Sequence, residues 1–187
     1  MKAILVHEFG GPDVLKLAEV PTPKPAAGEV LVRIHAAGVN PYDTYMRAGT
    51  YARKPPLPYT PGSDGAGVVD AVGEGVKKVK RKDRVYTTQT LSGAYAEYAL
   101  ALEQQVHPLP PKTSFSQGAG VWVPYGTAYH ALYHCAKAHA SETVLVHGAS
   151  GGVGTAAIQI ARSMGLTILG TAGTPIGLEI SKARGRL

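Results

Sequence analysis

Cysteine and tryptophan are nearly absent from this sequence of 187 residues, which contains one of each. The single cysteine, Cys135, excludes a disulfide within the chain and a cysteine-rich zinc module. Long hydrophobic runs are missing as well, since none approaches the roughly 20 residues of a membrane-spanning helix. The apolar run at residues 1–6 is too short for the hydrophobic part of a signal peptide. The sequence therefore predicts a soluble protein of the reducing cytoplasm, with no membrane partner.

Charged residues are also scarce, at 17% of the chain against 44% hydrophobic residues, a balance that favours a packed core over disorder. The net charge of +6 is concentrated between residues 77 and 84, where Asp83 is the only acid among lysines and arginines. A short basic run can attract nucleic acid or another polyanion. More often it is a solvated turn before a strand, and no nucleic-acid-binding motif accompanies this one.

Short apolar runs separated by glycines and prolines fill the first part of the chain. Between Glu29 and Val39, apolar residues alternate with the period of a strand. Asn40 and Pro41 predict the start of a short helix that ends near Gly49, with Asn40 as N-cap. Further strands are expected at residues 2–7, 14–20, 68–76, 85–88 and 94–102. Many short strands with Gly/Pro turns indicate a small barrel-like β domain over residues 1–115.

The pattern changes after Pro110 and Pro111. Helices are expected at residues 116–122, 127–139 and 152–164, and buried-type strands at 143–147 and 166–170. This order is a βαβ unit, which opens a parallel sheet. A dinucleotide-binding sheet has about six strands, so two strands would leave an apolar face and an edge uncovered. Either a partner covers them or the chain is a truncated form, and truncation is favoured. Residues 116–187 are therefore interpreted as an incomplete Rossmann-type domain with a divergent tail after Thr174.

The segment from Val144 to Gly154 reads Val-Leu-Val-His-Gly-Ala-Ser-Gly-Gly-Val-Gly and joins the expected strand to the expected helix. Glycines let the backbone approach a pyrophosphate, and the helix N-terminus supplies free N–H groups. The segment is not a strict G-x-G-x-x-G motif, because Ala149 stands at its first glycine. It predicts a nucleotide site, and the loop residues we expect to bind the cofactor are Ser150, Gly151, Gly152, Val153 and Gly154.

The residues at the end of the second expected strand should determine whether the site prefers NAD or NADP. In NAD enzymes an acidic residue about 20 positions past the glycines binds the ribose 2′-hydroxyl. Residues 167–175 contain no carboxylate, which permits a 2′-phosphate, and Gly173 in this stretch is expected to line the cofactor. No arginine stands there to bind the phosphate, although Lys182 or Arg184 could reach it from the tail. The stretch favours NADP over NAD.

Several motifs together resemble a known family: Ala37–Tyr45 (Ala-Gly-Val-Asn-Pro-Tyr-Asp-Thr-Tyr), Pro61–Gly67 (Pro-Gly-Ser-Asp-Gly-Ala-Gly), Gly93–Tyr98 (Gly-Ala-Tyr-Ala-Glu-Tyr) and the loop Gly148–Gly154. From Met1 to about Thr174 the chain is similar to the zinc-independent, zeta-crystallin-type NADPH:quinone oxidoreductases of the medium-chain dehydrogenase/reductase superfamily. The resemblance implies a GroES-like catalytic domain followed by a Rossmann-type domain. It also implies reduction of quinones, ortho-quinones above all and by one-electron transfer, in a homo-oligomer (dimer or tetramer).

The resemblance also assigns residues. It places Tyr51 near the cofactor, Asn40 and Tyr45 near the substrate, and Thr127 on the nicotinamide side. Each has a structural alternative: Asn40 as a helix cap, Tyr45 as a packing residue and Thr127 as a helix-start residue. For Asp43 a structural hydrogen bond is favoured over proton transfer.

Zinc is not expected. Zinc-dependent relatives place Cys and His where this chain has Asn40 and Pro41, and His and Glu where it has Ser63 and Asp64, and zinc prefers His, Cys and carboxylate ligands.

A rival metal site is suggested by four residues close together in the sequence, His130, His134, Cys135 and His139. A histidine pair at i, i+4 can chelate, but no Glu follows His130 as a zincin motif requires. In an α-helix Cys135 would lie roughly 100° from His134. Ordinary surface histidines are therefore favoured.

Two alternatives to an active enzyme stay open. The first is an AU-rich mRNA-binding protein, which the resemblance also implies and which a steep salt dependence would mark. The second is a catalytically inactive truncated form of the reductase, marked by exposed apolar surface and no cofactor binding.

Overall fold

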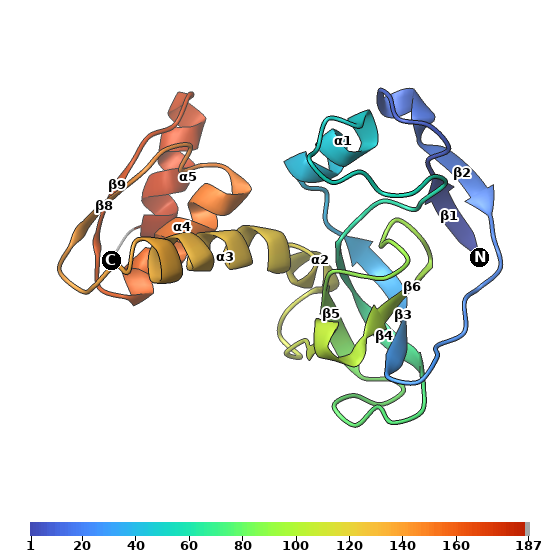
Figure 1. Cartoon of the computed structure of the whole chain (residues 1–187). Coiled ribbons are helices and arrows are strands. Elements are labelled where there is room, and N and C mark those ends of the chain that lie inside the picture. The colour runs from blue at the N-terminus through green and yellow to red at the C-terminus, as the bar shows by residue number, and fades with distance from the viewer. Residues whose placement is uncertain (186–187) are drawn as a thin grey trace. The chain divides into compact units, whose positions relative to one another are not determined.

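The computed structural model describes residues 1–185 and divides the chain into two compact units, Met1–Val121 and the residues from Trp122 onward (Figure 1). The first unit is mainly β and the second is a βαβ unit with additional helices. No helix within the described residues is both long and apolar enough to span a membrane.

A five-stranded antiparallel sheet forms the first unit, in the order β6-β3-β4-β5-β7. The strands are β3 (Glu29–Ala37), β4 (Asp64–Val72), β5 (Arg84–Thr88), β6 (Tyr98–Leu102) and β7 (Val106–Pro108). Its core is made of small β-branched side chains, fully buried at Val30, Val32, Val69, Val85 and Val106. β-Branched residues suit a pleated, buried surface, so the alternation seen in the sequence produces this sheet.

Smaller elements surround that sheet. They are β1 (Lys2–Leu5) and β2 (Lys16–Glu19), which pair with each other, the short helices η1 (Pro12–Val14) and η2 (Glu103–Gln105), and α1 (Pro41–Ala48). Helix α2 (Phe115–Gly118) packs against β3, β4 and β5. The expected domain boundary at 115/116 therefore differs by six residues from the boundary between the two compact units, because Gly118 and Ala119 are buried against Ala66 and Leu109.

The basic run lies in the turns between β4 and β5, and the side chains of Lys77, Lys78, Lys80, Arg81 and Lys82 are exposed. Glu103 accepts hydrogen bonds from the backbone N–H groups of Lys77 and Lys78, so a carboxylate fixes the turn from the neighbouring helix η2. Arg84 differs from the other cations: its guanidinium donates to the Thr113 carbonyl at 2.6 Å and lies over the Phe115 ring. The solvated turn predicted from the sequence is thus confirmed.

The second unit contains a parallel strand pair. Its elements are α3 (Trp122–Tyr129), the π-helix η3 (His130–Cys135), β8 (Thr143–Val146), α4 (Gly152–Ser163), β9 (Thr167–Gly170) and α5 (Pro175–Gly185). Helix α4 packs on both strands and α5 on β9, and in Figure 1 these helices lie on one side of the pair. Val146 faces the helices and is buried, whereas Leu145 and its register partner Leu169 are each 54% exposed. One face of the pair is therefore bare within the described residues.

The second unit differs from the expected elements in one helix and adds another in the tail. The helix expected at 127–139 begins earlier, at Trp122, and changes into the π-helical turn η3 that ends at Cys135. The tail after Thr174 forms helix α5 through Gly185, where Thr174 caps the helix by accepting the Gly177 N–H at 3.0 Å. Arg186 and Leu187, the last two residues of the predicted tail, lie outside the described residues.

Candidate functional site

The loop between β8 and α4 is a tight turn closed by its own backbone. Gly148 adopts a left-handed conformation with φ of 64°, which favours glycine, and its carbonyl accepts the Gly151 N–H at 3.0 Å. The Ala149 N–H donates to the Thr171 carbonyl at 2.8 Å and so ties the loop to the segment after β9. Ser150 to Val153 keep contact with solvent. The solvent-accessible part of the turn therefore lies at the carboxyl ends of both strands.

Gly154 sets how closely α4 approaches this turn. A Cβ atom at that position would lie 2.3 Å from the Gly148 carbonyl oxygen and 2.7 Å from the Ala149 Cα, and no side chain fits there. The Thr155 N–H makes the first turn's hydrogen bond, to the Gly151 carbonyl at 2.8 Å. N–H groups that precede the first such bond have no partner inside a helix, and together with the helix dipole they favour an anion. The geometry is that of a phosphate-binding turn.

The segment after β9 lies beside the glycine loop. Thr171 donates its N–H to the Val146 carbonyl at 3.0 Å, and its hydroxyl contacts the His147 Nδ1 at 3.1 Å. Around Gly173 no atom would lie within 4 Å of an added Cβ, so this position faces open space. Lys182, expected as a partner for a 2′-phosphate, lies on the exposed face of α5 and pairs with Glu179 at 3.2 Å.

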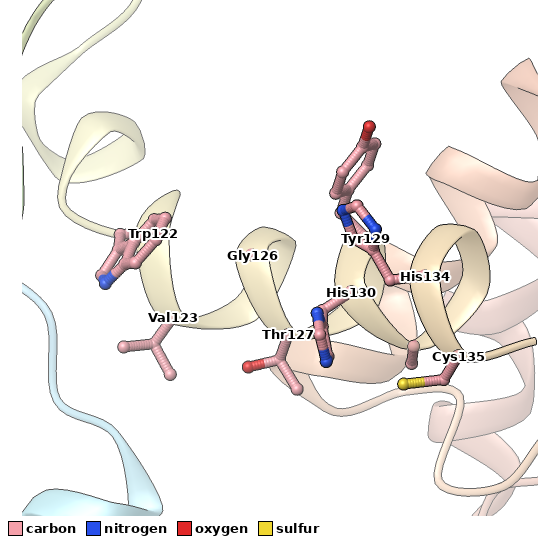
Figure 2. A pocket seen from close by; sticks show the side chains of 9 residues that line it. Trp122, Val123, Gly126, Thr127, Tyr129, His130, His134 and Cys135 are labelled. Atoms are coloured by element: carbon pink, nitrogen blue, oxygen red, sulfur yellow. The ribbon is translucent and has the colours of Figure 1, made fainter.

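Thr127 is exposed and lies in the interior of α3, so the alternative of a helix-start residue does not describe it. It lines a hollow of about 660 Å³ that runs along α3 and η3 (Figure 2). Two positions earlier, the Tyr125 hydroxyl donates to Gln159 Oε1 at 3.0 Å and fixes α3 to α4. The second unit thus contains Thr127, the glycine loop and Gly173.

The first unit contains the other predicted residues, beginning with Asn40. Asn40 is the N-cap of α1 and only 6% exposed. Its backbone N–H donates to Asp43 Oδ2 at 2.9 Å, and its side-chain amide donates to Asp64 Oδ2 at 3.0 Å. The Asp43 carboxylate also accepts a hydrogen bond from the Tyr95 hydroxyl at 3.4 Å. The structural hydrogen bond predicted for Asp43 is therefore confirmed, and the Asn40 amide is directed to a carboxylate of the fold itself.

Burial controls the protonation of this polar network. Desolvation raises the pKa of Asp43 above its ordinary value, and the hydrogen bonds from Asn40 and Tyr95 oppose part of that rise. Desolvation, with Asp43 as the main nearby charge, also raises the pKa of Tyr42 and Tyr95, which keeps both phenols protonated. The Tyr59 hydroxyl is buried without a hydrogen-bond partner among the described residues.

Tyr45 and Tyr51 meet at the other end of α1. The Tyr51 N–H donates to the Tyr45 carbonyl at 3.3 Å, just past the helix C-cap Gly49. Their side chains are 53% and 43% exposed, and the Tyr51 ring lies 5.8 Å from the Tyr42 ring. The two phenols are therefore available to a flat ligand, whereas Asn40 is committed to the buried end of the helix.

Asp64 and Tyr95 are the residues that the sequence reasoning missed as members of this network. Both stood inside motifs that carried the resemblance, but 24 and 52 residues separate them from Asn40 and Asp43 respectively. No local spacing reveals a contact of that range. Among the described residues, no group of three or more His, Cys, Asp or Glu side chains is arranged to hold a metal ion.

Comparisons with known proteins agree with this architecture. Residues 26–111 match the alcohol dehydrogenase GroES-like domain. The human quinone oxidoreductase is 59% identical over 181 residues, which are 96% of this chain and 55% of that protein. The chain therefore spans about half the length of the curated relatives it matches.

Solved structures show the same fold in both units. An Escherichia coli quinone oxidoreductase, solved in complex with NADPH, has a TM-score of 0.92 and 36% identity over 99% of this chain and 56% of its own. An NAD-dependent alcohol dehydrogenase has a TM-score of 0.93 and 34% identity over 99% of this chain and 62% of its own. These matches, with the GroES-like domain and the βαβ unit, show the fold of the medium-chain dehydrogenases/reductases and confirm the predicted fold class. Within that class, the chain is similar in sequence to quinone oxidoreductases over nearly all of its own length.

Proposed function

We propose that this chain binds NADPH on the loop Gly148–Gly154 and takes part in the NADPH-dependent reduction of quinones. The observation that carries the proposal is the close approach of the first turn of α4 to the glycine loop, which only glycine at position 154 permits and which leaves the N-terminus of the helix exposed to solvent. The relatives support it, because one is a human quinone oxidoreductase and another was solved with NADPH. The fold alone does not discriminate between NADPH and NADH, since an NAD-dependent enzyme has the same fold. The absence of a carboxylate at residues 167–175 favours NADPH.

Each residue has a separate task in this proposal. Backbone N–H groups of Ser150, Gly152 and Val153 would hold the pyrophosphate beside Gly151, whose own N–H donates to the Gly148 carbonyl at 3.0 Å. The open space at Gly173 would admit the ribose end. Thr127 would contact the nicotinamide side. Bound NADPH supplies the reducing equivalents, and the protein aligns it with the quinone.

Tyr45 and Tyr51 are the residues that would contact the quinone, which accepts the electrons. The exposed phenols of Tyr45 and Tyr51 can stack on a quinone ring or donate a hydrogen bond to its carbonyl oxygen. Asn40 acts with Asp64 to hold the start of α1 rather than as a free substrate contact. Preference for ortho-quinones, transfer of single electrons, assembly as a dimer or tetramer, catalysis without zinc and a cytoplasmic location complete the proposal.

The experiment is a titration with NADPH and with NADH, followed by nicotinamide fluorescence, on the 187-residue chain and on two variants. Gly151→Asp adds a negative charge at the helix N-cap, where Asp is a favourable cap and an added Cβ has ordinary contacts. We expect it to weaken NADPH binding by about tenfold or more through repulsion of the pyrophosphate, without loss of folding. Gly151→Ser is the matched neutral cap and should bind NADPH almost as the parent does.

Three results would overturn the proposal: a folded parent chain that does not bind NADPH, tighter binding of NADH, or equal binding by Gly151→Asp and Gly151→Ser. Saturable binding leads to assays with an ortho-quinone and a para-quinone acceptor. The RNA-binding alternative is favoured by one observation, the exposed basic turn at Lys77–Lys82. Binding of an AU-rich RNA that weakens steeply with salt, together with no binding of NADPH, would support that alternative.

A further inference from the structure

The π-helical turn η3 places two imidazoles on one exposed face of the second unit. His130 and His134 are both exposed, and both line the hollow that follows α3 and η3 (Figure 2). Their ring centres are 5.4 Å apart. Neither histidine belongs to the glycine loop or to the network around Asp43, and the proposed quinone reduction uses neither.

The distance between the two ring centres is close to the distance that a shared metal ion would give. A zinc–nitrogen bond of about 2.1 Å puts the ring centre about 3.2 Å from the metal, so two imidazoles at a tetrahedral angle have centres about 5.2 Å apart. The observed 5.4 Å is close to this distance. We propose that His130 and His134 form a two-histidine binding site for a divalent transition-metal ion of the zinc class.

The neighbouring aromatic rings hold one of the two ligands in place. His134 contacts the ring of Tyr129 edge-on at 5.5 Å and the ring of Tyr133 edge-on at 5.7 Å, and these two tyrosines stack on each other at 5.1 Å. In Figure 2 the His134 ring lies directly beside Tyr129. A histidine whose orientation is restricted by its neighbours loses less conformational freedom when it binds a metal.

The chemistry of the site selects the metal class. Imidazole nitrogen suits zinc, copper and nickel, whereas calcium and magnesium require oxygen ligands. Because no third His, Cys, Asp or Glu completes a cluster in the described part of the chain, water fills the remaining positions. Cys135 lines the same hollow without belonging to the ligand pair. The sequence favoured ordinary surface histidines here, because no Glu follows His130 and Cys135 would lie roughly 100° from His134 in an α-helix. Neither argument concerns a site made of the two histidines alone.

The test is isothermal titration of the 187-residue chain with Zn²⁺, in parallel with variants His130→Ala, His134→Ala and His139→Ala. His139 is an exposed histidine of the following turn and is the matched control. Removal of either ligand should weaken Zn²⁺ binding about tenfold or more, since the second imidazole acts at a high effective concentration. His139→Ala should leave the affinity unchanged. All three side chains are exposed, so the variants should fold as the parent does.

Histidine-ring NMR spectra give a second readout. Among the 7 histidines, the resonances of His130 and His134 should shift first as Zn²⁺ is added, and together. Equal Zn²⁺ affinity of the parent and of the His130→Ala and His134→Ala variants would overturn the proposal. So would a loss of affinity in His139→Ala as large as in the other two, or earlier shifts at other histidines. None of these readouts depends on NADPH or quinone, so this proposal and the proposed function fail separately.

Discussion

The two units bury their strands to very different degrees. In the first unit, β3 lies between β6 and β4 in a five-stranded sheet, and its residues Val30, Leu31 and Val32 are all buried. In the second unit, β8 and β9 form a sheet of two strands, and Leu145 and Leu169 are half-exposed at paired positions. Parallel strands are normally covered on both faces. Helices of the second unit cover one face of the pair.

The two units are therefore stabilised by different interactions. The first unit is held by long-range burial, since its core valines come from β3, β4, β5 and β7. The second unit is held mainly by the packing of α3 and α4 around small residues such as Ala128, Ala156 and Ala161, and by the glycine turn. The proposed cofactor loop therefore depends on close backbone contacts more than on a large apolar core. Substitutions at matched positions of the two units should show this.

The largest effect is expected for Gly154→Val in the second unit. The added Cβ would lie 2.3 Å from the Gly148 carbonyl oxygen, and α4 would have to move away from the turn. We expect a loss of about 3 kcal/mol or more in the free energy of unfolding, together with loss of NADPH binding. The single tryptophan, Trp122, lies in the second unit, so urea unfolding followed by tryptophan fluorescence reports on it.

Gly152→Ala is the control for that variant. An alanine Cβ at this position has its nearest neighbour, Pro124 Cγ, at 3.7 Å, which is ordinary contact. Its unfolding curve should stay close to that of the parent. A Gly154→Val chain that unfolds at the same urea concentration as Gly152→Ala would show that the close helix–turn approach does not stabilise the unit.

A middle-sized effect is expected from truncating one aliphatic side chain in each unit. Val32→Ala removes two methyl groups from a fully buried site and should lower the free energy of unfolding by about 2 kcal/mol. Leu145→Ala removes a larger group from a site that is 54% exposed, and its effect should be about 0.5 kcal/mol or less. Urea unfolding followed by circular dichroism measures both. A larger loss for Leu145→Ala would mean that the outer face of the β8–β9 pair is covered in solution.

The smallest effect is expected in the pH dependence of the free energy of unfolding. Because burial raises the pKa of Asp43 above its ordinary 3.8, the folded protein keeps this proton at pH values where the unfolded chain has released it. The contribution of Asp43 to stability is therefore greatest below pH 3.8, falls as the pH rises toward the raised pKa, and is constant above it.

Asp43→Asn should remove this dependence, because the amide keeps an acceptor oxygen for the Asn40 N–H but does not titrate. The free energy of unfolding of the parent, measured relative to Asp43→Asn, should decrease from pH 3.8 upward. Urea unfolding at a series of pH values measures the difference. Parallel pH profiles for the two proteins would contradict a raised pKa at Asp43.

The local elements were largely predictable because their signals are local. Asn40 and Pro41 marked the start of α1, and Gly49 is its left-handed C-cap, as the sequence indicated. The alternation around Val30 and Val32 marked β3, and the glycines after Val146 marked the turn into α4. The π-helical turn at His130–Cys135 was not predictable, because an α-helical periodicity describes the same residues until the backbone hydrogen bonds are known.

The sequence by itself determined the two-part organisation, the strand and helix types and the turn that can hold a phosphate, because propensity and glycine spacing act over a few residues. Only the tertiary structure decided that Asp64 accepts a hydrogen bond from the Asn40 amide, that Tyr95 donates one to Asp43, and that the ring centres of His130 and His134 are 5.4 Å apart. Those contacts depend on strand register and on the pitch of one helical turn. The spacing of residues within one motif predicts neither the strand register nor the helical pitch, because burial across the whole chain fixes both.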